Sequence, residues 1–160
     1  LAAFVGRLCV VRGSTLASAE SCTGGMLSEL LTSIPGSRRY FHSGWITYSD
    51  EAKVKLLNVD SKLLEMHGAV SEPVAQAMAE GARRNASTTL AMAITGIAGP
   101  DGGTPAKPVG LVVVTLATPD SCAVRSLNLF GDRGMIRRAS SIAAMEMARQ
   151  WLLKRRTERP

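Results

Sequence analysis

Segments with the residue patterns of strands and of helices alternate along this chain. Residues 15–19 alternate small and apolar side chains as a short strand does, and a glycine-rich turn follows over residues 20–25. Apolar residues between Met26 and Leu31 then recur at helical spacing. This order of strand, tight turn and helix favours an α/β fold, a three-layer α/β/α sandwich in which helices cover both faces of a sheet.

The same patterns continue to the end of the chain. They predict further helices over residues 2–12, 51–57, 61–67, 71–84 and 132–155, and further strands over residues 43–48, 89–95, 110–117 and 123–130. The sheet therefore has about five strands. Only a few residues around Pro119 join the last two strands, which is too few for a parallel crossover. We expect these strands to form an antiparallel hairpin in a mainly parallel, mixed sheet.

Polar residues mark the starts of three of these helices. Ser49 or Asp50 can cap the helix over 51–57, and Asp132 can cap the last helix. Ser71 is followed by an acid and a proline, so it is predicted to cap the helix that it begins. The apolar stripe predicted for the last helix comprises Ile136, Ser140, Ala143, Met147 and Trp151.

Length and charge limit the organisation of the chain. Its 160 residues, 46% of them apolar, suit one folded domain over residues 1–160. Of the 19 basic and 13 acidic residues, 11 and 10 lie in residues 1–131, and 8 and 3 lie in residues 132–160. The net charge of +6 therefore collects at the C-terminal end, where residues 154–160 read as a basic tail. The body of the domain gives no reason to expect a nucleic-acid partner.

Several sequence features indicate the compartment. No run of about 18 apolar residues predicts a spanning helix, and the start of the chain does not resemble a secretory signal. Cys9, Cys22 and Cys122 fit neither a disulfide framework nor a metal-binding pair, and we expect no metal site. We therefore expect a cytoplasmic protein without a membrane partner. The chain begins with Leu1 rather than Met, so we also expect an N-terminal residue or segment to be missing.

The turn after the first strand carries a candidate nucleophile. Ser21 lies at the bend between strand and helix, and the amides of the residues that follow it could stabilise an oxyanion or hold a phosphate. Alternatively, Ser21 or Thr23 is only an N-cap, or Cys22 is the nucleophile. The amide donors expected there belong to Cys22, Thr23, Gly24 and Gly25.

A serine nucleophile needs a base, and histidine is poorly supported here. His67 precedes a glycine at a predicted helix end, and His42 lies in a predicted loop without a local partner. A partly desolvated lysine with an assisting tyrosine is the remaining route, and Tyr48 and Lys53 lie at the end of the second strand and on the helix after it. The alternative is that Lys53 is a solvated helix lysine, as we expect for Lys55.

A long glycine-rich loop follows the buried strand over residues 89–95. Its length and composition predict a loop that cradles a ligand, although a plain surface loop is the alternative. Arg133 and Arg137 lie at the start of the last helix, where arginines could bind a phosphate. The loop residues expected to line a site are Thr95, Gly96, Gly99, Gly102 and Gly103.

Motifs spread over nearly the whole chain resemble those of the CinA C-terminal domain family, the nicotinamide-nucleotide amidohydrolases. They are AESCTGG at 19–25, PGS at 35–37, ITYSDEAK at 46–53, HGAVSE at 67–72, ITGIAGPDGG at 94–103, KPVG at 107–110, and GDR at 131–133 with Arg137. Any one of these motifs would be a modest signal, but their combination in the family's order is specific.

The resemblance implies hydrolysis of nicotinamide mononucleotide to nicotinate mononucleotide and ammonia, without a metal or another cofactor, as part of pyridine nucleotide recycling. It implies Ser21 as nucleophile, Lys53 as base and Tyr48 as an assisting hydroxyl. It also implies that Thr95 and the glycines after it line the nucleotide site, with Arg133 the first candidate for the phosphate and Arg137 the second. Family members often assemble, so we expect a homo-oligomer, here in the stand-alone form without a larger N-terminal domain.

A second hypothesis belongs to another class of protein. The basic end of the chain and the family's association with competence and damage responses could indicate a non-catalytic nucleotide-binding or DNA-associated accessory module. No aromatic residues are interleaved with the terminal charges, which disfavours binding of single-stranded nucleic acid.

Overall fold

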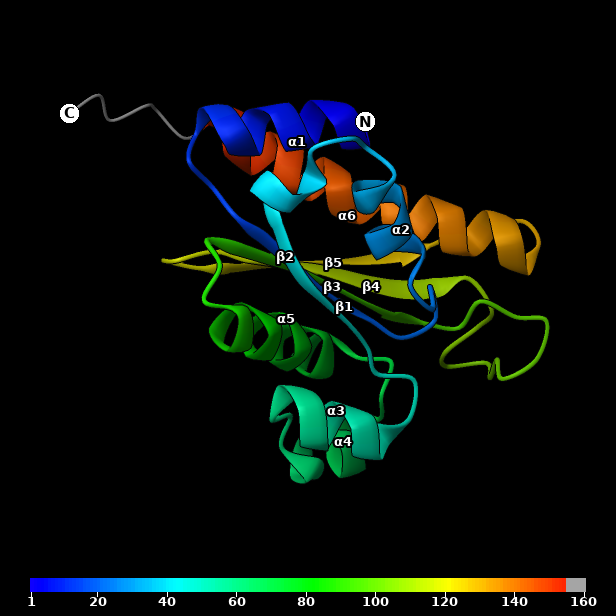
Figure 1. Ribbon diagram of the computed structural model, residues 1–160. Helices are drawn as coiled ribbons and strands as arrows, with labels where there is room; N and C mark the ends of the chain where they lie inside the picture. The colour runs from blue at the N-terminus through cyan, green and yellow to red at the C-terminus, as the bar shows by residue number, and fades with distance from the viewer. Residues whose placement is uncertain (155–160) are drawn as a thin grey trace.

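The computed structural model describes residues 1–154 and contains one five-stranded sheet with helices on both faces (Figure 1). The helices are α1 (Ala2–Val11), α2 (Met26–Thr32), α3 (Asp50–Leu57), α4 (Ser61–His67), α5 (Glu72–Ala86) and α6 (Arg133–Lys154), with a short 3-10 helix η1 (Ser37–Arg39). The strands are β1 (Leu16–Glu20), β2 (Phe41–Ile46), β3 (Leu90–Gly96), β4 (Leu111–Ala117) and β5 (Cys122–Asn128). The expected α/β fold with five strands is confirmed.

The sheet has the strand order β2-β1-β3-β4-β5 and is mixed, as predicted. Strands β2, β1 and β3 run parallel, and β4 forms the expected antiparallel hairpin with β5. Strand β4 is also antiparallel to β3, which the sequence analysis did not anticipate. The connection over residues 97–110 contains no helix that could cross over the sheet, so the chain must re-enter it from the edge at which it left.

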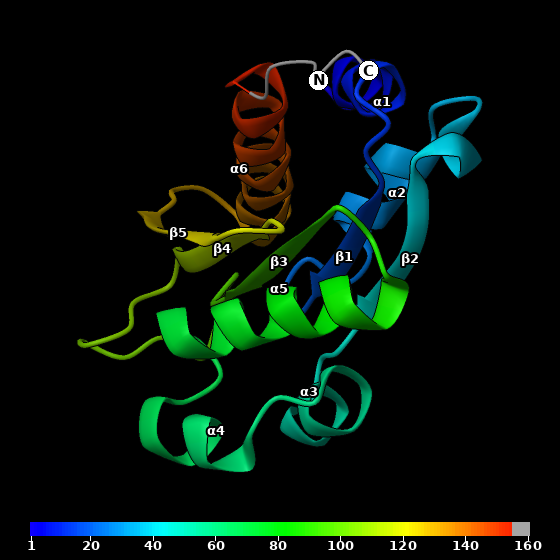
Figure 2. The same ribbon diagram turned by 90° about the vertical axis from the view of Figure 1, so that its left-hand side faces the viewer.

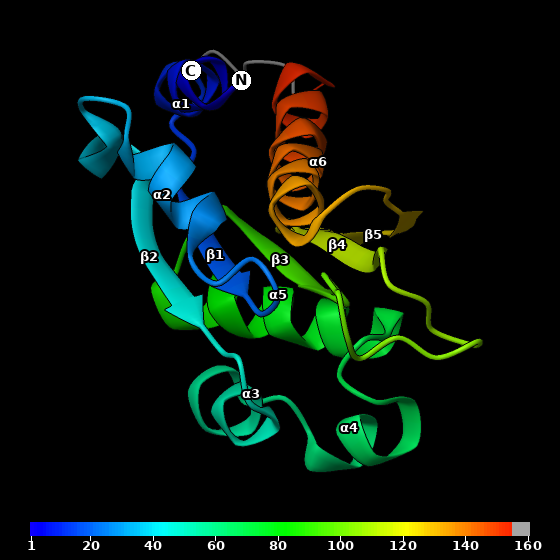
Figure 3. The same cartoon turned by 90° about the vertical axis from the view of Figure 1, so that its right-hand side faces the viewer.

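The helices form layers around two cores. Helix α5 covers one face of the sheet, and α1, α2 and α6 cover the other (Figures 2 and 3). One core includes Leu16, Met92 and Val114 of the sheet with Ile136 of α6, and the other is built from small strand alanines against α5. Helices α3 and α4 pack on the outer side of α5, which places the start of α3 near the C-terminal edge of the parallel strands.

Two predicted caps are present and one is not. The Ser49 hydroxyl accepts a hydrogen bond from the Ala52 amide at 3.1 Å, and a carboxylate oxygen of Asp132 accepts one from the Met135 amide at 2.8 Å. Ser71 precedes α5, but its hydroxyl does not cap the helix. It donates instead to the Gly68 carbonyl at 2.8 Å, because the turn between α4 and α5 brings that carbonyl within reach.

The last helix buries a face displaced slightly from the predicted stripe. Ile136, Ser140 and Met147 are buried as expected, whereas Ala143 and Trp151 are only half-buried. The fully buried positions beside them are Ala144, Ala148 and Leu152. Of the basic tail predicted over residues 154–160, Lys154 belongs to α6 and residues 155–160 lie outside the described residues, as does the end of the helix predicted near Arg155. Among residues 1–154, no helix is long and apolar enough to cross a membrane.

Candidate functional site

The expected site residues converge at the C-terminal edge of the parallel strands, because β1, β2 and β3 all end there. A pocket of about 260 Å³ lies at this edge, between the strand ends, the loop over residues 97–110 and the start of α6. Nine of the fourteen predicted residues line it: Ser21, Cys22, Tyr48, Lys53, Thr95, Gly96, Gly99, Gly102 and Arg133. The other five, Thr23, Gly24, Gly25, Gly103 and Arg137, lie outside its lining.

The turn after β1 presents Ser21 at the pocket. Its amide donates to the Ile94 carbonyl of β3 at 2.9 Å, and its carbonyl accepts from the Gly24 amide at 3.0 Å. Gly24 and Gly25 have φ angles of +57° and +98°, the left-handed region that glycine adopts without strain. Ser21 is only 9% exposed, and it lines the pocket from a hydrogen-bonded backbone.

Glu20 is the residue of this turn that the sequence analysis missed. Its fully buried carboxylate accepts hydrogen bonds from the amides of Gly25, Leu27 and Ser28 at 3.0, 3.0 and 2.8 Å. The Ser28 hydroxyl donates a fourth at 2.6 Å. The start of α2 is therefore capped by a carboxylate at the end of β1, and neither Ser21 nor Thr23 is its N-cap. An acidic residue at the end of an otherwise apolar strand was the available signal.

The backbone amides of residues 22–25 therefore fall into two groups. Those of Gly24 and Gly25 bind the chain's own oxygens, so they are not free to bind an oxyanion or a phosphate. The amides of Cys22 and Thr23 remain as candidate donors beside Ser21.

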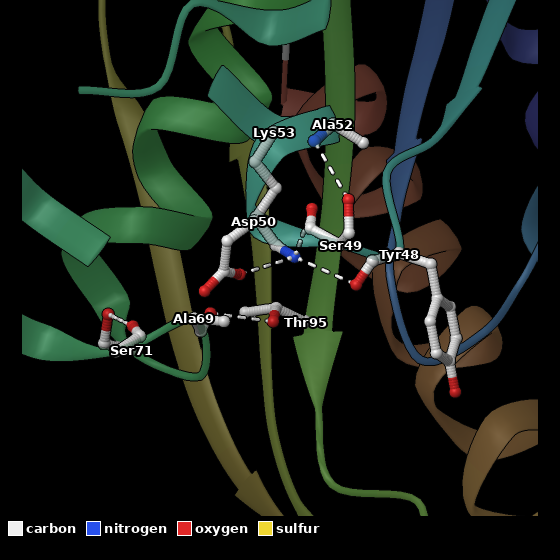
Figure 4. A network of polar contacts seen from close by, with 9 residues as sticks. Tyr48, Ser49, Asp50, Ala52, Lys53, Ala69, Ser71 and Thr95 are labelled. Carbon is white, nitrogen blue, oxygen red and sulfur yellow. Dashed lines mark hydrogen bonds and ion pairs between the residues drawn. The ribbon is translucent and has the colours of Figure 1, made fainter. Parts of the chain in front are cut away.

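Lys53 is buried and not a solvated helix lysine. Only 1% of it is exposed, and its Nζ lies 3.4 Å from the Tyr48 carbonyl, 3.3 Å from the Ser49 carbonyl and 3.4 Å from an Asp50 carboxylate oxygen (Figure 4). Lys55 is exposed, as predicted. The first turn of α3 thus holds an amino group at the pocket by three oxygens, two of them carbonyls that cannot move independently of the backbone.

Tyr48 offers Lys53 its carbonyl, while its phenol ring extends away from Nζ (Figure 4). The phenol oxygen accepts a hydrogen bond from Nη2 of Arg133 at 3.0 Å, and Nη1 of Arg133 donates to the Gly99 carbonyl at 2.8 Å. Arg133 therefore bridges the end of β2 and the glycine-rich loop at the pocket mouth. In this arrangement the Tyr48 hydroxyl is hydrogen-bonded to Arg133, and Tyr48 contacts Lys53 only through its carbonyl.

Arg137 lies one helical turn further along α6 and has a different contact. Its Nη2 and Nε donate to the Thr23 carbonyl at 2.6 and 3.2 Å. The guanidinium thus fastens the Ser21 turn to α6. Thr23 itself is fully buried, and its hydroxyl has no hydrogen-bond partner among the described residues.

The glycine-rich loop is tied down on two sides and is not a free surface loop. Thr95, at the end of β3, donates its hydroxyl to the Ala69 carbonyl at 2.8 Å, which fixes the segment between α4 and α5 as a pocket wall. Lys107 donates to the His67 carbonyl at 2.6 Å and so joins the loop to the end of α4. His42, expected in a loop, instead lies within β2.

Electrostatics distinguish the two candidate nucleophiles. Burial raises the pKa of the Cys22 thiol to about 11, although Arg133 and Arg137 oppose the shift. The thiol is therefore protonated near neutral pH, which disfavours Cys22 as a nucleophile. Within residues 1–154, no three His, Cys, Asp or Glu side chains are grouped so as to hold a metal ion.

Comparisons with known proteins agree with the fold. The sequence model of the CinA C-terminal domain matches residues 1–152. A CinA-like protein of Citrifermentans bemidjiense is 51% identical over 145 residues, which cover 91% of this chain and 35% of that protein. The chain spans about a third of the length of the curated relatives that it matches.

Solved structures give the same result. A CinA superfamily protein from Klebsiella pneumoniae superposes with a TM-score of 0.92 at 33% identity, over 95% of both chains. The competence/damage inducible protein CihA of Agrobacterium tumefaciens superposes with a TM-score of 0.87 at 36% identity, over 94% of both chains.

Proposed function

We propose that this chain, which belongs to the CinA C-terminal domain family, is an amidohydrolase that converts nicotinamide mononucleotide to nicotinate mononucleotide and ammonia. The observation that carries the proposal is the placement of Ser21 and the buried Lys53 in the lining of one pocket. A hydroxyl on a fixed turn and an amino group excluded from water are the two groups that a serine–lysine hydrolase needs. Such an activity belongs to cytoplasmic recycling of pyridine nucleotides.

The proposed reaction uses these two groups. The Ser21 oxygen attacks the carboxamide carbon while Lys53 takes up the hydroxyl proton. The amides of Cys22 and Thr23 donate to the oxyanion that forms. Collapse of this intermediate breaks the carbon–nitrogen bond, and the proton passes to the leaving group, which departs as ammonia. Water then attacks the acyl-Ser21 ester, and nicotinate mononucleotide is released with Ser21 restored.

The shape of the pocket suits one end of this substrate. A volume of about 260 Å³ is below that of most drug-sized ligand pockets, so it can enclose the nicotinamide ring and part of the ribose but not the whole nucleotide. Arg133 at the pocket mouth is exposed, and it is the cation that would pair with the phosphate outside the enclosed part.

The test is ammonia release from nicotinamide mononucleotide by the purified chain. Release in the wild type and loss of at least about 1000-fold in Ser21→Ala, with an unchanged circular dichroism spectrum, would support the proposal. Absence of ammonia release by folded wild-type protein between pH 6 and 10 would refute it. Unchanged activity in Ser21→Ala would show that another group is the nucleophile.

A further inference from the structure

The mechanism proposed above leaves Glu20 unused, although this side chain lies next to Ser21 in sequence. Its carboxylate is 0% exposed, and burying a charge is unfavourable unless the protein supplies hydrogen bonds in compensation. Four donors surround it: the amides of Gly25, Leu27 and Ser28, and the Ser28 hydroxyl. A serine, threonine or asparagine would cap a short helix without this desolvation penalty.

The four contacts fix the geometry of the turn from both ends. The carboxylate belongs to the last residue of β1, and its donors are the N-cap residue Gly25 and the first turn of α2, so hydrogen bonds close the segment over residues 21–24 into a loop. A second brace comes from Arg137, which donates twice to the Thr23 carbonyl. With that carbonyl turned toward α6, the orientation of the Thr23–Gly24 peptide is set.

The bracing of the turn matters for the amides that are proposed to bind the oxyanion. An oxyanion hole functions only when its donors already point to the position that the oxyanion will occupy, because reorientation during the reaction costs free energy. The Gly25 amide donates to the Glu20 carboxylate, and the Gly24 amide donates to the Ser21 carbonyl. Two of the four turn amides are therefore not available to an oxyanion. The Cys22 and Thr23 amides lie in the turn that these contacts brace.

We propose that Glu20 is a positioning residue for the reaction at Ser21: its buried carboxylate organises the turn so that the Cys22 and Thr23 amides form the oxyanion hole. This inference rests on the proposed function for its natural substrate. It also applies to any acyl donor that passes through a tetrahedral oxyanion at Ser21.

The first test compares Glu20→Gln with Glu29→Gln. Glutamine keeps the size of the side chain but replaces one acceptor oxygen by an NH₂ group, so donors facing that position lose their acceptor. Glu29 is an exposed acid in the first turn of α2, the helix that Glu20 caps, which makes Glu29→Gln the matched control. With nicotinamide mononucleotide, kcat should fall about 100-fold in Glu20→Gln while KM changes less than about threefold. Glu29→Gln should leave both constants unchanged.

A merely structural role would lower Tm without lowering kcat selectively over KM. For this reason kcat is calculated per folded protein, with the folded fraction measured by near-ultraviolet circular dichroism. A wild-type kcat in folded Glu20→Gln would overturn the proposal. If that variant does not fold, Glu20→Asp decides the question, because it keeps the charge and shortens the reach. An unchanged kcat in Glu20→Asp would equally overturn it.

A second substrate separates this inference from the proposed function. Acylation of Ser21 by p-nitrophenyl acetate needs an oxyanion hole but no recognition of a nucleotide. Acylation that is rapid in the wild type and about 100-fold slower in Glu20→Gln would support the role of Glu20 even if nicotinamide mononucleotide proved not to be hydrolysed. Equal acylation rates in the two proteins, or none in the wild type, would overturn it and leave the amidohydrolase assay to judge the proposed function.

Discussion

Arg133 donates a hydrogen bond of 3.0 Å to the hydroxyl of Tyr48 across the mouth of the pocket. The same guanidinium donates to the Gly99 carbonyl at 2.8 Å, so one side chain of α6 connects the end of β2 with the glycine-rich loop. These bonds orient a cation beside the pocket without neutralising it, because a phenol and a carbonyl are neutral acceptors. The charge is therefore available to a phosphate.

This arrangement predicts different kinetics for two substitutions. Arg133→Ala removes a charge-assisted contact to phosphate, so kcat/KM for nicotinamide mononucleotide should fall about 10- to 100-fold, mainly through KM. Tyr48→Phe removes one of the two acceptors that orient Arg133 and leaves its charge in place, so we expect KM to rise less than about tenfold at nearly constant kcat. Initial-rate kinetics of ammonia release measure both effects. A loss confined to kcat in Tyr48→Phe would instead show that the Tyr48 hydroxyl assists proton transfer.

Lys53→Met should abolish turnover while retaining most of the packing of α3. Methionine fills a similar volume, but the pocket lined by Ser21 then lacks the proposed base, and a loss of about 100- to 10,000-fold in kcat is expected. Lys55→Met, two positions along the same helix and exposed, is the matched control and should keep wild-type activity. Activity is measured with ammonia release and folding with the urea midpoint. Retention of kcat in Lys53→Met would exclude Lys53 as the base.

The sequence predicted which residues approach the site better than it predicted what they contact. The order of strands and helices placed Ser21 and Thr95 at strand ends and Lys53 on the helix after the second strand, which is sufficient to bring them to one edge of a sheet. Local patterns contain no information on the direction of Tyr48 or on the burial of Lys53. The Tyr48 hydroxyl meets Arg133, which is 85 residues away in the chain, and Lys53 lies in a pocket that is completed by the loop after β3.

Glu20 shows the same limit more clearly. Its partners lie five to eight residues away and meet it only after two consecutive left-handed glycines have turned the chain. The antiparallel pairing of β4 with β3 was missed for a related reason. The long loop before β4 was read as a ligand loop, but its lack of a crossover helix also fixes the strand direction.

The thiol of Cys22 should be unreactive at neutral pH. Its pKa is raised to about 11 by burial, so at pH 7.5 only about one thiol in 3000 is ionised. The rate of Cys22 alkylation by iodoacetamide should rise about tenfold per pH unit up to that value. Mass spectrometry of the Cys22 peptide measures this rate. Cys22→Ala should lose less than about tenfold of the amidase activity, whereas Ser21→Ala loses nearly all of it. Rapid alkylation at pH 7 would contradict the assignment of the nucleophile.

Gly81→Ala tests the contact between α5 and the end of α3. A Cβ atom at position 81 would overlap the Leu57 carbonyl oxygen, which is backbone and cannot rotate away. The helices must therefore separate, and a destabilisation of about 2 kcal/mol or more is expected from urea unfolding. Gly134→Ala on α6 is the control, because its nearest neighbour is the Asp132 carboxylate oxygen at 3.2 Å. Equal unfolding free energies for the two variants would show that the α3–α5 contact is loose.

Glu146 should contribute a pH-dependent part of the stability. Hydrogen bonds from Arg149, at 2.6 Å to each oxygen, and from Gln150 lower the pKa of Glu146 to about 2. A group whose pKa is depressed in the folded state stabilises it above the unfolded-state pKa, here near 4.5, and loses that contribution as the pH falls toward 2. The contribution is moderated by solvent, because both side chains are 31% exposed.

The free energy of unfolding of wild-type protein should therefore exceed that of Glu146→Gln by a constant amount above about pH 6, and the difference should shrink as the pH falls below 4.5. Urea titrations at several pH values measure it, and 1 M salt should reduce it because the pair is partly exposed. Gln150 also accepts a hydrogen bond from Arg125 of β5 at 3.0 Å, so the contact between Gln150 and Arg125 connects α6 to the edge strand. A difference independent of pH would mean that Glu146 acts through packing and not through its charge.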